Sequence, residues 1–76
     1  MKRMRQLTIQ YEPECELLCI DTNKTSVAEV DRFSEESYVQ CFIGGMSINL
    51  QYNKQYKKYI GSAAGLEFST DGPKIY

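Results

Sequence analysis

The chain has 76 residues, of which 42% are hydrophobic and 25% are charged, and its formal net charge is −1. These proportions are typical of a globular protein and exclude a wholly disordered chain. Apolar runs reach only three or four residues, so no segment is expected to span a membrane, and no apolar signal-peptide core follows the basic N-terminus. We therefore expect one cytoplasmic domain over residues 1–76, with residues 1–5 as a basic tail.

Two strands are expected in the first part of the chain. Residues 6–12 alternate between apolar and polar side chains, and residues 15–21 are apolar on both faces, which indicates a central strand. Pro13-Glu14 between them suits a turn. A two-residue turn there would pair Ile9 with Leu18 and Leu7 with Ile20. A longer turn fits almost as well, so this register stays open.

A helix is expected over residues 27–37. Ser26 and Glu29 have the spacing of a capping box, in which each side chain bonds a free backbone amide of the first helical turn. Apolar side chains then recur at a spacing of three, at Val27, Val30 and Phe33. This narrow stripe predicts that the helix packs across one face of a sheet.

The clearest local pattern is a hairpin that closes on Gly44-Gly45, because tight two-residue turns need positive φ angles that glycine adopts without strain. Counting outward from the turn places six apolar side chains on one face, in the pairs Ile43–Met46, Cys41–Ile48 and Val39–Leu50. The other face carries the pairs Phe42–Ser47, Gln40–Asn49 and Tyr38–Gln51. A slip of one residue would scatter the apolar set over both faces, so the pattern fixes the register.

The segment 52–60 fits two structures. Its apolar residues Tyr52, Tyr56, Tyr59 and Ile60 have helical spacing, and a glycine follows where a helix would end. Strand alternation fits less well, so a short helix is favoured. A last hairpin is expected between residues 66–70 and 74–76, with Phe68 opposite Ile75. The predicted fold class is thus α+β: an antiparallel sheet of four to six strands with one helix on one face.

Enzyme activity is not expected. The chain contains no histidine, which removes the usual general base and any Ser-His or Cys-His nucleophile. Cys15 and Cys19 would lie about 13 Å apart in an extended strand, too far for a disulfide, and their spacing with no histidine does not suit zinc. We expect all three cysteines to be reduced and packed as small hydrophobic residues, with no metal and no cofactor.

Charge and surface pattern favour a protein-binding module instead. Residues 12–36 hold eight acids and two bases, a net charge of −6, and the remainder carries +5. Such polarity steers association with a partner that has a basic surface. The predicted contact residues combine exposed acids with the aromatic side chains of the polar hairpin face: Asp31, Glu35, Glu36, Tyr38 and Phe42.

The alternative is a nucleic-acid-binding accessory protein. Lysine neutralises phosphate and tyrosine stacks on bases, so this function would use Lys54, Tyr56, Lys57 and Lys58. Because the total charge is slightly negative, we favour the first interpretation. Small histidine-free domains of this kind are often regulators or inhibitors, and bacteriophages and other mobile elements encode many of them. A monomer or a homodimer is expected.

Overall fold

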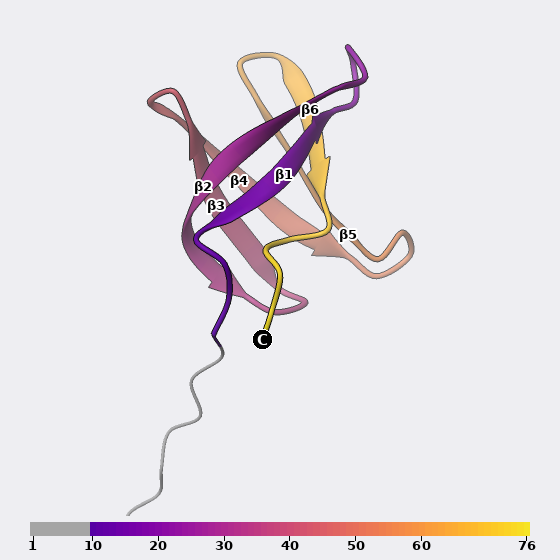
Figure 1. Cartoon of the computed structure of the whole chain (residues 1–76). Coiled ribbons are helices and arrows are strands. Elements are labelled where there is room, and N and C mark those ends of the chain that lie inside the picture. The colour runs from indigo at the N-terminus through magenta and orange to yellow at the C-terminus, as the bar shows by residue number, and fades with distance from the viewer. Residues whose placement is uncertain (1–9) are drawn as a thin grey trace, which may run out of the picture.

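The computed structural model describes residues 10–76 and shows an all-β protein (Figure 1). Its six strands are β1 (Glu14–Cys19), β2 (Lys24–Ser34), β3 (Tyr38–Ile43), β4 (Met46–Asn53), β5 (Lys58–Ala63) and β6 (Leu66–Thr70). They form a closed barrel in which each strand is antiparallel to its neighbours in sequence. The expected α+β class is therefore wrong, because the described residues contain no helix.

The barrel closes between the first strand and the last. Leu18 pairs with Ser69, and Cys19 pairs with Phe68. Because the strands run up and down in turn, the turns of β1–β2, β3–β4 and β5–β6 lie at one end, which we call the hairpin end (Figure 1). The turns 35–37 and 54–57 lie at the other end together with the C-terminus, and we call this the terminal end.

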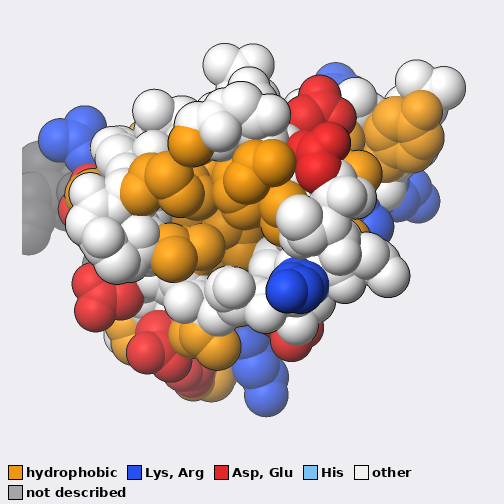
Figure 2. Space-filling model, turned by 90° about the horizontal axis from the view of Figure 1, so that it is seen from above, with side chains coloured by type: hydrophobic (Ala, Val, Ile, Leu, Met, Phe, Trp, Pro, Cys, Tyr) orange, Lys and Arg blue, Asp and Glu red, His pale blue; other side chains and the backbone are white. Residues whose placement is uncertain are grey.

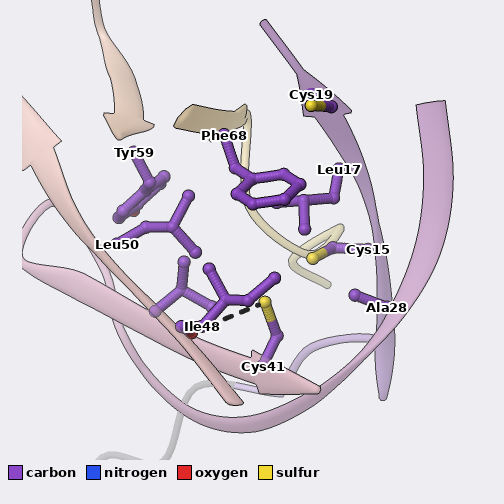
Figure 3. Packing of buried hydrophobic residues seen from close by; sticks show 10 residues of the cluster. Cys15, Leu17, Cys19, Ala28, Cys41, Ile48, Leu50, Tyr59 and Phe68 are labelled. Carbon is purple, nitrogen blue, oxygen red and sulfur yellow. Dashed lines mark hydrogen bonds between the residues drawn. The ribbon is translucent and has the colours of Figure 1, made fainter. Parts of the chain in front are cut away.

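The core is the filled interior of the barrel. Five side chains from β1, β3 and β4 are almost completely buried: Leu17, Val39, Cys41, Ile48 and Leu50. Tyr59 and Phe68 reach the same cluster from β5 and β6, respectively (Figure 3). In residues 10–76, these side chains fill the interior of the small barrel.

The Gly44-Gly45 hairpin has the register expected from the sequence. All six predicted pairs of β3 and β4 are present, from Ile43 with Met46 at the turn to Tyr38 with Gln51. Both glycines have positive φ angles, 51° and 87°. The apolar face of this hairpin is buried, but it faces the barrel interior and not a helix.

The predicted helix over 27–37 is wrong, since residues 24–34 form β2. The pairing of β2 with β3 shifts between Val30 and Arg32, which is a β-bulge at Asp31. In a regular strand every second side chain points to the same face. The extra residue of a bulge lengthens that interval to three residues at this point. Val30 and Phe33 therefore both pack against the core, although they are three residues apart.

The short helix over 52–60 is also wrong. Tyr52 lies near the end of β4 and pairs with Tyr59 on β5, and the four-residue turn 54–57 connects the two strands. The side-chain oxygen of Asn53 accepts hydrogen bonds from the backbone amides of Gln55 and Tyr56, at 2.9 and 3.1 Å. Tyr56 is thereby placed at the exposed tip of the turn.

The expected pairing of Phe68 with Ile75 is wrong, because Phe68 pairs with Cys19 and Gly61. In the expected first hairpin, Leu18 pairs with Thr25 and Ser69, and its proposed partner Ile9 lies outside the described residues. Tyr11 and Ile75 instead form a bridge that joins the two ends of the described chain. The basic tail 1–5 and most of the expected strand 6–12 lie outside the described residues.

An aromatic cluster fills the terminal end of the barrel. Tyr11 contacts Phe33 edge to face, with ring centres 5.0 Å apart, and Phe33 contacts Tyr59 at 5.9 Å. Tyr52 lies on the other side of Tyr59 at 5.0 Å. From residue 10 to residue 76, the chain forms no helix of the length and hydrophobicity needed to cross a membrane.

Candidate functional site

The outer surface of β3 and β4 carries aromatic and amide side chains in register. Strand alternation turns Tyr38, Gln40 and Phe42 of β3 outward, opposite Gln51, Asn49 and Ser47 of β4. Tyr38 is 40% exposed, whereas Phe42 is half-buried. The predicted Tyr38 and Phe42 thus share one face, as expected from the hairpin register.

The bulge in β2 adds a cation to this surface. After the shift at Asp31, Arg32 pairs with Gln40, so the side chain of Arg32 lies on the outer side beside β3. We call the set Arg32, Tyr38, Gln40, Phe42, Asn49 and Gln51 the β3–β4 face. An open cavity of about 410 Å³ lies on it, and all of these residues except Phe42 line it.

The β3–β4 face combines three kinds of contact. An arginine offers five hydrogen-bond donors in a fixed plane, amides both donate and accept, and a tyrosine ring offers apolar area. Tyrosine and arginine are enriched at protein interfaces, whereas lysine and glutamate are depleted there. The face is therefore suited to recognition and holds no arrangement of a nucleophile with a base.

The three predicted acidic residues lie at the border of this face. Asp31 occupies the exposed bulge, and Glu35 and Glu36 are exposed in the turn immediately before Tyr38. The remaining acids of the segment 12–36 lie before β1, on β1, in the β1–β2 turn and on β2. Glu14 pairs directly with Glu29 across β1 and β2, on the neighbouring outer surface. The structure thus places Glu35 and Glu36 in the turn next to Tyr38 and Asp31 in the bulge next to Arg32, without joining every acid of the segment in one patch.

The four basic and aromatic residues of the alternative site separate into two groups. Lys54, Tyr56 and Lys57 are exposed in the turn 54–57, and Tyr56 is 63% exposed. Lys58 lies on β5 and forms an ion pair of 2.7 Å with Asp71. Both side chains of this pair are largely exposed, so its contribution to stability is small.

The three cysteines are free and buried in the interior, as expected. Cys15 pairs with Ala28 on one side of β2 and Cys41 pairs with Val30 on the other, and their sulfur atoms point toward one another in the barrel interior (Figure 3). The Cys41 thiol is 3.8 Å from the Ile48 carbonyl oxygen, to which it donates a weak hydrogen bond. The neighbouring Cys15 thiol and burial raise the pKa of Cys41, which favours its protonated form.

Sequence reasoning missed Arg32 as a site residue. A helix over residues 27–37 would not place Arg32 beside Gln40, and the bulge that does so leaves no signal in a single sequence. The cavity depends on the pairing of β2 with β3, and the sequence pattern of the β3–β4 hairpin does not specify this pairing. Among residues 10–76, no group of three or more His, Cys, Asp or Glu side chains is placed to hold a metal ion.

Comparison with known proteins does not assign the chain to a family. No protein-family model, no curated protein and no solved structure matches the chain.

Proposed function

We propose that the protein is a non-catalytic binding module that regulates or inhibits another protein by occupying one of its surfaces. The observation that carries this proposal is the cavity of about 410 Å³ on the β3–β4 face, lined by Arg32, Tyr38 and three amide side chains. Hot spots of protein interfaces are enriched in tyrosine and arginine and lie in places where water can be excluded. The β3–β4 face offers a tyrosine and an arginine beside a cavity that a partner side chain would occupy.

The proposed partner is a cytoplasmic protein with basic residues around its contact site. Asp31, Glu35 and Glu36 border the β3–β4 face and would attract such a surface over distance. Free buried cysteines are compatible with a reducing compartment. The module would act as a monomer or a homodimer.

The two parts of the site are expected to affect different rate constants. Burying an aromatic side chain contributes about 2 kcal/mol, whereas an exposed ion pair contributes at most about 1 kcal/mol. Phe42→Ala should therefore increase the dissociation rate, since it removes apolar contact. Glu35→Lys combined with Glu36→Lys should mainly slow association, and the effect should shrink at high salt.

The experiment begins with capture of a partner from the lysate of the native host and its identification by mass spectrometry. Association and dissociation rates of the purified partner are then measured for the parent protein, for Phe42→Ala and for the double lysine variant. Ser62→Ala, at an exposed position on β5, serves as the control. Unchanged rates for a folded Phe42→Ala variant and for the double lysine variant would reject the proposed surface.

A second candidate function rests on the exposed turn 54–57. Tyr56 projects there between Lys54 and Lys57, an arrangement suited to stacking on a base and pairing with phosphates. We test it with a single-stranded thymidine oligonucleotide and a duplex at low salt. Binding that weakens steeply with salt and is lost in Lys54→Ala with Lys57→Ala would support this function. No binding of either probe would exclude it.

A further inference from the structure

Between β2 and β3, backbone pairing covers only part of the length of β2. Their pairing runs from Glu29 with Phe42 to Ser34 with Tyr38, whereas residues 24–28 pair with β1 alone. We call residues 24–28 the β2 edge. Figure 1 shows β2 and the β3–β4 hairpin diverging toward the hairpin end. One side of the β2 edge is therefore open.

The backbone groups on the open side can be identified. The amide of Val30 donates a 2.8 Å hydrogen bond to the carbonyl oxygen of Pro13, so the backbone of Val30 faces β1. Backbone groups alternate between the two sides of a strand, so those of Ala28 and Ser26 also face β1. The N–H and C=O groups of Thr25 and Val27 face the open side. Along the described chain, no strand pairs with them there.

Acidic side chains lie beside the β2 edge on the outer surface of the barrel. Val27 points outward and is 66% exposed, opposite Glu16 on β1. Glu29 follows on the same side of β2, opposite Glu14. Basic side chains on the outer side of an added strand would be attracted to these carboxylates, which make this part of the outer surface acidic.

Apolar side chains lie on the inner side of the same opening. Ile43, Met46, Ala63 and Leu66 pack on the core but remain partly exposed at the hairpin end. Figure 2 views the molecule from this end and shows a continuous hydrophobic area at its centre, with polar atoms around it. A strand beside the β2 edge would turn every second side chain toward this area.

We propose that the β2 edge binds an extended segment of a partner protein, in which basic and apolar residues alternate, as an added β-strand. The added strand bonds to the backbone of Thr25 and Val27. Its basic residues lie next to Val27 on the outer side of the barrel, the side that also carries Glu16 and Glu29, and its apolar residues cover the hydrophobic area. This surface is separate from the β3–β4 face, so the inference goes beyond the proposed function and does not depend on it.

The test uses a capped seven-residue peptide of alternating lysine and valine, and hydrogen exchange of single amides followed by NMR. In the free protein, the amides of Thr25 and Val27 should exchange faster than those of Ser26 and Ala28. The peptide should slow exchange at Thr25 and Val27, by about tenfold when nine-tenths of the protein is bound. A peptide of alternating glutamate and valine should have no effect. Absent protection, or equal protection by both peptides, would overturn the proposal.

Two further reagents test the backbone hydrogen bonds directly. Val27→Pro removes an amide that faces the open side, a position where proline is tolerated in a strand, and it should abolish peptide binding. Val27→Thr keeps the amide and should bind as the parent does. The lysine–valine peptide with methylated backbone nitrogens should not bind the parent protein. This result does not depend on whether the proline variant folds. Binding of the methylated peptide as tight as that of the unmethylated peptide would contradict the added strand. Tyr38→Ala should leave peptide binding unchanged, which separates this test from that of the β3–β4 face.

Discussion

The phenolic oxygen of Tyr59 on β5 accepts a hydrogen bond of 2.8 Å from the backbone amide of Glu36 in the β2–β3 turn. Tyr59 is 4% exposed and packs between the rings of Phe33 and Tyr52. This hydrogen bond therefore stabilises the position of the turn 35–37 against the core of the barrel. Tyr38 begins β3 directly after this turn, so Tyr59 helps to position one end of the β3–β4 face.

Tyr59→Phe should lower the free energy of unfolding by about 1 kcal/mol. The variant keeps the ring and its packing, but it leaves the Glu36 amide without its acceptor. Urea unfolding measures the change. Tyr56→Phe, in the exposed turn 54–57, is the matched control and should unfold as the parent does. Equal midpoints for parent and Tyr59→Phe would show that the bond contributes nothing.

The same residue predicts a loss of stability at alkaline pH. Burial raises the pKa of Tyr59 above its ordinary value of about 10, so the folded state favours the neutral phenol. The unfolded chain ionises first, and this contribution to stability is complete below pH 10 and lost as the pH rises through the higher folded value. The stability difference between the parent and Tyr59→Phe should therefore stay constant up to about pH 9 and decrease as the pH rises above about 10. A constant difference would contradict the raised pKa.

Ile48→Ala and Leu50→Ala should each cost about 2–4 kcal/mol, because both side chains are fully buried inside the barrel. Their neighbour Ser47 is exposed on the opposite side of β4, so Ser47→Ala should change stability by less than about 0.5 kcal/mol. Urea midpoints of the three variants test the register of β4. Similar midpoints for all three would mean that the inward and outward residues are assigned wrongly.

Gly61→Ala should destabilise the barrel more than Gly44→Ala does. A Cβ atom at Gly61 would meet the Asn49 carbonyl group and lie 3.0 Å from the Leu50 Cα atom, both backbone atoms of β4. At Gly44 nothing lies within 4 Å, and only the positive φ angle opposes a side chain. We expect losses of about 2–3 kcal/mol and about 1 kcal/mol, respectively. Thermal unfolding of the two variants gives the comparison, and the reverse order would be inconsistent with close contact between β4 and β5.

The Gly44-Gly45 hairpin could be predicted because all of its determinants are local. The turn needs two positive φ angles, and alternation on both sides fixes which residues face inward. Closure of the barrel could not be predicted in this way. It depends on the pairing of Leu18 with Ser69, which are 51 residues apart, and no local pattern specifies that pair.

The two wrong helices have a common physical cause. In β2, the bulge at Asp31 places inward residues three apart, which resembles the spacing of a helix. In residues 52–60, Tyr52 and Tyr59 face inward from two strands, while Tyr56 between them is exposed in a turn. The turn-forming side chain of Asn53 was the local signal against that helix. The bulge has no such signal, and for this reason Arg32 was not recognised as part of the site.

The most direct test of the proposed function compares two exposed tyrosines on the two candidate surfaces. Tyr38 lies on the β3–β4 face, and Tyr56 lies in the basic turn 54–57. The dissociation constant of the purified partner is measured for Tyr38→Ala and Tyr56→Ala, with circular dichroism as a check that both variants are folded. Tyr38→Ala should weaken binding by about 30-fold, corresponding to about 2 kcal/mol, and Tyr56→Ala by less than about twofold. A loss of affinity in Tyr56→Ala with none in Tyr38→Ala would contradict a partner site on the β3–β4 face.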